Sequence, residues 1–289
     1  MLDPVSARSI DQSIAQALAH LQNLRLDRLD AQLLLLHALG RGAHDRAWLM
    51  AHDTDRVSPS VSDRLEDLVR RRLHGEPVAY LTGHKEFFGL DLEVDGRVLV
   101  PRPDTETLVE WALEVLSSCP AARVIDLGTG SGAIALALKH SRPDLRVHAI
   151  DTSPDALTVA RANARRLQLD VQFHQGSWLT GVVETFDLVL SNPPYIAAQD
   201  PHLAALVHEP PQALASGADG LDDIRRIIAQ APTHLLPAGW LLLEHGYDQA
   251  AAVRELLAGA GFVGVQSHSD LAGVERCTGG QWDATPHPT

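Results

Sequence analysis

Four consecutive residues, Asn192 to Tyr195, combine groups that could hold a planar amino group for a reaction at its nitrogen. Asn192 brings a side-chain carbonyl acceptor. Pro193 and Pro194 fix φ and remove two backbone donors, so the carbonyls of Asn192 and Pro193 need not compete with nearby N–H groups. Tyr195 offers a flat face. A bound amide or exocyclic amine would donate both hydrogens to oxygen and keep its nitrogen lone pair free for an electrophile, as N-methyl transfer requires.

The same tetrapeptide is also a set of ordinary turn formers, so a second motif is needed to decide between a turn and a site. Residues 126–132 read Asp-Leu-Gly-Thr-Gly-Ser-Gly after a predicted strand, where glycines allow a tight turn and the next helix presents free N–H groups. Asp151 ends the following strand and can accept hydrogen bonds from ribose hydroxyls. These features predict a nucleoside-bearing cofactor. The candidate residues are Asp126, Gly128, Thr129, Gly130, Ser131, Gly132 and Asp151.

The glycines alone leave the cofactor open, because residues 128–133 also satisfy a loose dinucleotide fingerprint and so allow an NAD-dependent enzyme. Two features favour S-adenosylmethionine. Asp126 opens the loop with a negative charge, which suits an ammonium group better than a pyrophosphate. The strand before Asn192 ends at the carboxyl edge of the same predicted sheet, where such ligands bind.

The elements that must position these residues alternate between strand and helix after Cys119. This alternation predicts an α/β fold, a Rossmann-like, doubly wound and mostly parallel seven-stranded sheet with helices on both faces. The predicted strands cover 123–127, 146–150, 171–174, 186–190, 240–244, 263–268 and 275–278. The predicted helices cover 133–140, 154–167, 222–236 and 249–260.

In the first part of the chain, the apolar residues recur at a different spacing. Apolar residues recur at three and four positions between 10 and 73, which predicts helices. The period changes to two between 83 and 100, with Asp95 and Gly96 as the expected hairpin turn, and Asp104 or Thr105 could cap the next helix. We therefore predict three regions: a helical N-terminal domain (1–80), a β-hairpin linker (81–103) and a methyltransferase domain (104–289).

Composition narrows the function further. The formal net charge is −13 over 289 residues, which argues against stable nucleic-acid binding through phosphates. The two cysteines have no paired spacing and no metal-binding pattern appears, so neither a disulfide framework nor a metal site is expected. The N-terminus lacks a secretory pattern, and no apolar run is long enough to cross a bilayer. We expect a cytoplasmic enzyme without membrane association.

The full set of motifs resembles the release-factor glutamine methyltransferase family over almost the whole chain. Adenine N6 methyltransferases that act on nucleic acid share the tetrapeptide, so that activity is an alternative function. They do not share the full set of motifs together with a helical N-terminal domain. The supporting stretches are 75–83 (GEPVAYLTG), 87–88, 101–106 (PRPDTE), 126–132, 191–196 (SNPPYI), 200–203, 209–210, 217–221, 243–246 (LEHG) and 270–276.

The resemblance implies methyl transfer from S-adenosylmethionine to the side-chain nitrogen of the glutamine in the Gly-Gly-Gln motif of peptide chain release factors, which are the expected protein partners. It also implies that the helical N-terminal domain (1–80) is the substrate-docking domain. It implies that Asn192 and the Pro193 carbonyl take the two amide hydrogens while Tyr195 packs on the amide plane. For the cofactor, it places Asp126 at the amino-acid part and Asp151 at the ribose.

The resemblance also places Trp178 at the adenine. Ser177 precedes it where the family often has an acidic residue, and a serine oxygen can still accept from the adenine amino group. Trp178 could instead be only a core aromatic. The chain carries its own Gly-Gly-Gln at 279–281, near the end of a predicted edge strand, where coincidence is a simpler reading than self-methylation of Gln281.

Overall fold

The computed structural model describes residues 12–283 and divides the chain into two compact units, Met1–His84 and Lys85–Thr289. Within the described residues, no helix is both long enough and apolar enough to span a bilayer. The predicted boundaries of the docking domain, linker and methyltransferase domain remain predictions.

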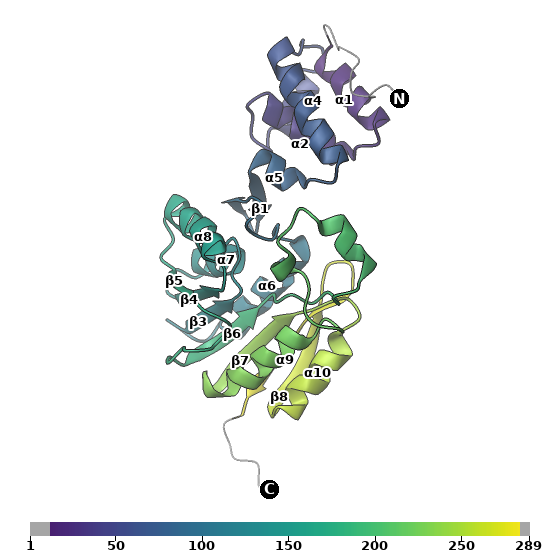
Figure 1. The fold of residues 1–289 in the computed structure, drawn as a ribbon. Helices are drawn as coiled ribbons and strands as arrows, with labels where there is room; N and C mark the ends of the chain where they lie inside the picture. The colour runs from purple at the N-terminus through teal and green to yellow at the C-terminus, as the bar shows by residue number, and fades with distance from the viewer. Residues whose placement is uncertain (1–11, 284–289) are drawn as a thin grey trace. The chain divides into compact units, whose positions relative to one another are not determined.

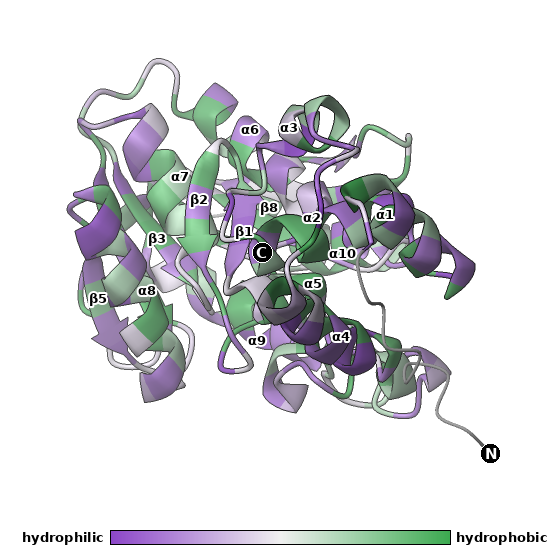
Figure 2. Ribbon diagram, turned by 90° about the horizontal axis from the view of Figure 1, so that it is seen from above, coloured by the Kyte–Doolittle hydropathy of each residue, from purple (hydrophilic) through white to green (hydrophobic). Residues whose placement is uncertain are grey.

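The first unit is built from short amphipathic helices around one apolar core. Its helices are α1 (Ile14–Asn23), α2 (Arg28–Ala38), α3 (Arg46–Ala51), α4 (Pro59–Leu73) and α5 (Val78–Thr82). Figure 2 shows α4 mostly in hydrophilic purple, interrupted by green, and the buried residues that supply its apolar face are Val61, Leu65, Leu68 and Val69. At the start of α1, Ser13 and Gln16 cap each other's backbone N–H groups in a capping box.

A two-stranded hairpin, β1 (His84–Phe87) and β2 (Leu90–Glu93), precedes the large sheet. The predicted turn at Asp95 and Gly96 was wrong. The strands are joined instead by Phe88 and Gly89, both of which have positive φ (50° and 76°), as a tight two-residue hairpin turn requires. Asp95 does form a local turn, because its carboxylate accepts from the backbone N–H of Arg97 at 3.0 Å.

The second unit contains a seven-stranded sheet with the order β5-β4-β3-β6-β7-β9-β8. The strands from β5 to β7 run parallel, and β9 is antiparallel to both of its neighbours. Figure 1 shows this sheet between its helices. The strands are β3 (Arg123–Leu127), β4 (Arg146–Asp151), β5 (Gln172–Gln175), β6 (Phe186–Ser191), β7 (Leu235–Glu244), β8 (Phe262–Ser269) and β9 (Glu275–Trp282).

Helices cover both faces of the sheet. The helices of this unit are α6 (Glu106–Val115), α7 (Ala133–Ser141), α8 (Pro154–Leu167), α9 (Asp222–Gln230) and α10 (Ala250–Gly259). The pair α9 and α10 packs on the alternate strand residues that include Ile125, Val189 and Leu241, while α6 contacts α7. The central strands β3, β6 and β7 contain nearly continuous buried apolar runs, which made them predictable. The outer strand β5 is mostly exposed and polar.

The predicted fold class is confirmed, and every predicted strand and helix of the sheet region is present. Two details were wrong. The helix that begins at Asp222 ends at Gln230, followed by a 3-10 turn at Ala231–Thr233 and by β7. Neither Asp104 nor Thr105 caps α6 through its side chain, because the Thr105 hydroxyl instead accepts from Asn192. Ser153 does cap α8, as its hydroxyl accepts from the backbone N–H of Ala156.

The chain's own Gly-Gly-Gln lies inside β9, which sits between β7 and β8 and is therefore not the predicted edge strand. The side-chain amide of Gln281 donates to the Ala238 carbonyl at 2.9 Å. These glycines leave room for neighbouring side chains and do not shape a flexible loop, which favours coincidence over self-methylation.

We expect Gly279→Ala to lower the free energy of unfolding by about 3 kcal/mol, because overpacking a core forces its neighbours to move. An added Cβ would lie 2.4 Å from a methyl carbon of Leu242 and 2.6 Å from the Leu241 carbonyl oxygen. Urea denaturation measures the change. Gly259→Ala is the matched control, since no heavy atom lies within 4 Å of its added Cβ, and equal stability of the two variants would contradict the packing argument.

Candidate active site

The candidate site forms where three neighbouring parallel strands, β3, β6 and β7, end at the same edge of the sheet. Leu127 pairs with Ser191, and Ser191 pairs with Leu243. The next residues along these strands are therefore Gly128, Asn192 and Glu244. The sheet order thus brings the predicted cofactor loop and the predicted amine-binding tetrapeptide together from positions far apart in the sequence.

The glycine loop turns sharply after β3. Gly128, Gly130 and Gly132 all have positive φ (74°, 55° and 85°), a conformation that favours glycine. The backbone N–H groups of Gly128 and Thr129 donate to the Ile150 carbonyl at 2.8 and 2.9 Å, which ties the loop to the end of β4. Ser131 is buried behind the loop.

Asp151 connects the glycine loop to the start of α8. One carboxylate oxygen accepts from the backbone N–H of Gly130, and the other accepts from Ser153, both at 2.9 Å. Burial raises the pKa of Asp151, and these backbone hydrogen bonds oppose that shift. Each carboxylate oxygen has a second lone pair, so Asp151 can hold this frame and still accept from a ligand hydroxyl.

Asp126 is fully buried beneath the same loop. Its Oδ2 accepts from the Thr129 hydroxyl at 2.6 Å, while its Oδ1 has no hydrogen-bond partner within the described residues. Burial raises the pKa of Asp126 to about 7, and the Thr129 hydrogen bond acts in the opposite direction. The backbone N–H of Ala135 also lowers this pKa. A buried carboxylate is costly unless it is compensated, so a ligand that brings positive charge over the glycine loop would stabilise it.

A cavity of about 260 Å³ opens at these strand ends. Trp178 lines it and also packs on the core below, with the edge of its ring 3.3 Å from where a Cβ of Gly128 would lie. A side chain at position 128 would therefore crowd the indole ring. Of the predicted site residues, this cavity is lined by Gly128, Gly130, Asp151, Ser177, Trp178, Asn192 and Pro194.

A second, smaller cavity of about 90 Å³ lies against the tetrapeptide. Asn192, Pro193 and Tyr195 line it, and it shares Leu99, Asn192 and Ala213 with the larger cavity. Asn192 therefore stands between a pocket that could hold a cofactor and a pocket that could hold an acceptor group. The remaining predicted residues, Asp126, Thr129, Ser131 and Gly132, are buried and line neither cavity.

The side chain of Asn192 is held by Thr105, since its Nδ2 donates to the Thr105 hydroxyl at 3.1 Å. Within the described residues, no backbone N–H donates to the carbonyl of Asn192 or of Pro193. Ligand binding by these two carbonyls remains a prediction. The Tyr195 hydroxyl donates to the buried carboxyl group of Glu244 at 3.5 Å.

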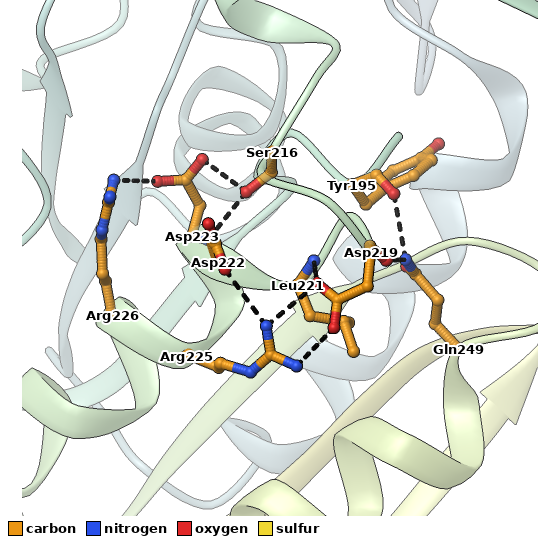
Figure 3. Close-up of polar contacts among 9 residues, drawn as sticks. All are labelled: Tyr195, Ser216, Asp219, Leu221, Asp222, Asp223, Arg225, Arg226 and Gln249. Carbon is orange, nitrogen blue, oxygen red and sulfur yellow. Dashed lines mark hydrogen bonds and ion pairs between the residues drawn. The ribbon is translucent and has the colours of Figure 1, made fainter. Parts of the chain in front are cut away.

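Two neighbouring segments hold the end of the tetrapeptide in place, as Figure 3 shows. The Gln249 side-chain amide donates to the carbonyls of Tyr195 and Asp219 at 3.0 and 3.2 Å. Ser216, whose N–H donates to the Ile196 carbonyl, is fixed in turn by hydrogen bonds between its hydroxyl and Asp223. This double attachment limits the movement of the Tyr195 backbone.

An ion pair between a buried carboxylate and a partly exposed arginine fixes the wall that the two cavities share. The Glu209 carboxylate is 3% exposed; it accepts from the Arg102 guanidinium and from the backbone N–H of Val100, the latter at 3.1 Å. A buried charge is tolerated when it is paired and hydrogen-bonded in this way. The pair joins the segment that carries Leu99 to the segment that carries Ala213.

Within residues 12–283, no group of three or more His, Cys, Asp or Glu side chains is arranged to hold a metal ion. The arrangement offers a nucleoside-sized cavity lined by the Asp151 carboxylate, and beside it a pocket lined by the Asn192–Pro193 segment. Such a site suits the transfer of a group to a planar nitrogen.

Comparison with known proteins identifies the family. The family model of the Methyltransferase small domain matches residues 105–221, and that of the PrmC N-terminal domain matches residues 12–83. The release factor glutamine methyltransferase of Xylella fastidiosa (strain Temecula1) is 50% identical over 261 residues, which are 89% of this chain and 94% of the relative. The Pseudomonas aeruginosa enzyme of the same name is 51% identical over 259 residues, 88% of this chain and 92% of the relative. This chain belongs to the release factor glutamine methyltransferase family.

The resemblance predicted from the sequence is therefore confirmed. The chain also resembles a crystal structure of a methyltransferase from Pyrococcus furiosus, with a TM-score of 0.52 and 19% identity. The match covers 74% of this chain and 97% of the Pyrococcus chain. At that identity the likeness shows only that the two chains share a fold.

Several site residues of this family member were not assigned a role from the sequence. Glu209 and Glu244 lie in stretches that carry the resemblance, but nothing local indicates that either would be buried. Gln249 precedes α10 and reads as an ordinary helix start. Thr105 was predicted as a cap. Each acts on a residue far away in the chain, which a single sequence does not reveal.

Proposed function

We propose that this enzyme transfers a methyl group from S-adenosylmethionine to the side-chain amide nitrogen of the glutamine in the Gly-Gly-Gln motif of peptide chain release factors. The observation that carries the proposal is the position of Asn192, which lines both the nucleoside-sized cavity and the small pocket beside the tetrapeptide. The identity of the substrate is inferred from family membership. The helical region 1–80 would dock the release factor, and an enzyme with this substrate fits the predicted cytoplasmic location.

The residues of the larger cavity fit S-adenosylmethionine. Asp151, which lines the cavity, would accept from the ribose hydroxyls, and the charge of Asp126, buried beneath the glycine loop, would attract the ammonium group. The Trp178 ring would cover the adenine, with Ser177 as an acceptor for the adenine amino group. The cofactor supplies an electrophilic methyl group on a sulfonium.

The tetrapeptide would act by positioning. An amide nitrogen is a poor nucleophile because its lone pair is delocalised into the carbonyl. Asn192 Oδ1 and the Pro193 carbonyl would accept the two amide hydrogens, which favours a pyramidal nitrogen and points its lone pair at the larger cavity. Tyr195 would pack on the amide plane. The nitrogen becomes acidic as it gains the methyl group and can lose its proton afterwards, so no strong base is required before transfer.

Cofactor binding should depend on pH through Asp126. Its pKa of about 7 means that the carboxyl group is mostly neutral at pH 6 and mostly ionised at pH 7.5, so affinity for S-adenosylmethionine should rise about eightfold between these values. Calorimetric titration measures this change. In Asp126→Asn the affinity should be weaker and nearly flat over the same range, and an undiminished slope in that variant would exclude Asp126 as its source.

The Asp126 carboxyl group should also affect the stability of the folded protein when no cofactor is bound. A carboxyl group whose pKa is higher when folded binds more protons in the folded state, so the free energy of unfolding contributed by Asp126 should fall as pH rises from about 4 to about 7. Bound cofactor should reverse this trend by pairing with the ionised carboxylate.

The direct test of the substrate class is transfer of labelled methyl from S-adenosylmethionine to purified release factors, with duplex DNA and RNA as parallel acceptors. We expect label in the release factor. Label in nucleic acid instead, together with strongly salt-dependent binding, would support the adenine N6 alternative.

A further inference from the structure

A second buried carboxyl group lies beside the tetrapeptide without a role in the proposed chemistry. Glu244, at the end of β7, is 1% exposed. Its Oε1 accepts from the Tyr195 hydroxyl at 3.5 Å, and its Oε2 has no hydrogen-bond partner among the described residues. The only other such oxygen in this part of the chain belongs to Asp126, to which the proposed function gives a ligand. Burying an incompletely paired carboxylate costs stability, so a function for Glu244 is expected.

Thr105 connects Glu244 to the residue that meets the substrate. The Thr105 side chain is 4% exposed, and its hydroxyl accepts from Asn192 Nδ2 at 3.1 Å. The same side chain lies beside the Glu244 carboxyl group and lowers its pKa. Three polar side chains, Glu244, Thr105 and Asn192, therefore lie in a row that joins β7, the start of α6 and the end of β6.

The direction of the hydrogen bonds along this row of side chains follows from the number of protons available. A carboxylate only accepts hydrogen bonds, and a threonine hydroxyl has one proton to donate. While Glu244 is ionised, a Thr105 hydroxyl that turns its proton toward the carboxylate can only accept from Asn192. The nitrogen end of the Asn192 amide must then face Thr105, which leaves the oxygen end for the acceptor pocket.

We propose that Glu244 is a positioning residue which, through Thr105, fixes the orientation of the Asn192 amide so that the site presents an acceptor, and not a donor, to the substrate nitrogen. With the orientation reversed, the Asn192 NH₂ group would face the NH₂ group of the substrate, and two donors do not pair. The inference rests on the proposed function, because it concerns the same transfer reaction.

Protonation of Glu244 should allow the Asn192 amide to leave this fixed orientation. Burial raises the pKa of Glu244 to about 7, with Asp104 adding to the rise and with the Thr105 hydrogen bond and Arg276 opposing it. Tyr195 and the neighbouring strand residue Cys277 also face the group. A neutral Glu244 can itself donate to Thr105, so the hydroxyl is free to turn and both amide orientations become available. At saturating cofactor, kcat should fall as pH decreases through about 7.

The test compares Glu244→Gln with the exposed control Glu255→Gln on α10. We expect Glu244→Gln to lower kcat about tenfold at pH 8 and to flatten the fall in kcat below pH 7, with little change in the affinity for S-adenosylmethionine. The control should behave as the wild type. An unchanged kcat and an unchanged pH profile in folded Glu244→Gln would overturn the inference.

A second pair of variants keeps the inference testable if Glu244→Gln does not fold. Thr105→Val has nearly the same shape without the hydroxyl and should lower kcat about tenfold, whereas Thr105→Ser keeps the hydroxyl and should restore most of that loss. Equal kcat in the two variants would contradict a role for the hydroxyl.

A measurement without substrate separates this inference from the proposed function. In ¹⁵N-labelled protein, the Asn192 side-chain NH₂ signals, identified by their loss in Asn192→Ala, should show one proton protected from exchange in the wild type and neither protected in Thr105→Val. Protection that survives in Thr105→Val would overturn the inference. If the wild type transfers no methyl group to the release factor, the proposed function fails, while these signals still decide the orientation of Asn192.

Discussion

Asn192→Ala should lower kcat for methyl transfer by about 10²–10³-fold, the loss typical when a preorganised group at the reacting centre is removed. The variant loses one of the two acceptors proposed for the amide hydrogens and leaves the Thr105 hydroxyl without its donor. Because Asn192 is only one of many residues that line the cofactor cavity, the affinity for S-adenosylmethionine should weaken less than about tenfold. Single-turnover kinetics at saturating cofactor, combined with calorimetric titration, separates the two effects.

Gln172→Ala is a suitable control for this variant, since Gln172 is an exposed amide on the outer strand β5. It should transfer methyl groups at the wild-type rate. A folded Asn192→Ala that also does so would exclude the positioning mechanism, whatever happens to its cofactor affinity.

Asp151→Ala should weaken the affinity for S-adenosylmethionine by about 10²-fold. The substitution removes the acceptor proposed for the ribose hydroxyls, a charged hydrogen-bonding group worth about 1.5–3 kcal/mol. It also frees the backbone N–H groups of Gly130 and Ser153, which the carboxylate now holds at 2.9 Å each. The glycine loop and the start of α8 would lose their common anchor.

Calorimetric titration of S-adenosylmethionine measures this loss, with Asp155→Ala as the control. Asp155 is an exposed carboxylate in the first turn of the same helix, so its removal changes the net charge equally and leaves the loop intact. At saturating cofactor, Asp151→Ala should recover much of its kcat. Similar affinities in the two variants would contradict the assignment of Asp151 to the ribose.

The sheet and the glycine loop could be predicted because their signals are local. The central parallel strands β3, β6 and β7 contain short apolar runs, and the loop after β3 needs glycines where φ is positive. The hairpin turn was misplaced because Asp95 and Gly96 have the stronger turn composition, whereas the turn forms at Phe88 and Gly89, where a bulky residue has φ of 50°. Residue composition alone therefore did not identify which of these two nearby segments forms the hairpin turn.

The residues that support the tetrapeptide could not be predicted for a different reason. Thr105 is 87 positions from Asn192, and Gln249 is 54 positions from Tyr195. Their contacts depend on the order of strands in the sheet, which places β7 beside β6 and brings the start of α6 to the same edge. A single sequence gives the strands but does not specify which distant side chains meet at their ends.

The most direct test of the central claim is peptide mapping of a release factor after incubation with this enzyme and S-adenosylmethionine. The account predicts one added methyl group, located on the side-chain nitrogen of the glutamine in the Gly-Gly-Gln motif, and none in a release factor whose motif glutamine is replaced by alanine. Methylation at another residue, or an unmodified motif glutamine with active enzyme and bound cofactor, would contradict it.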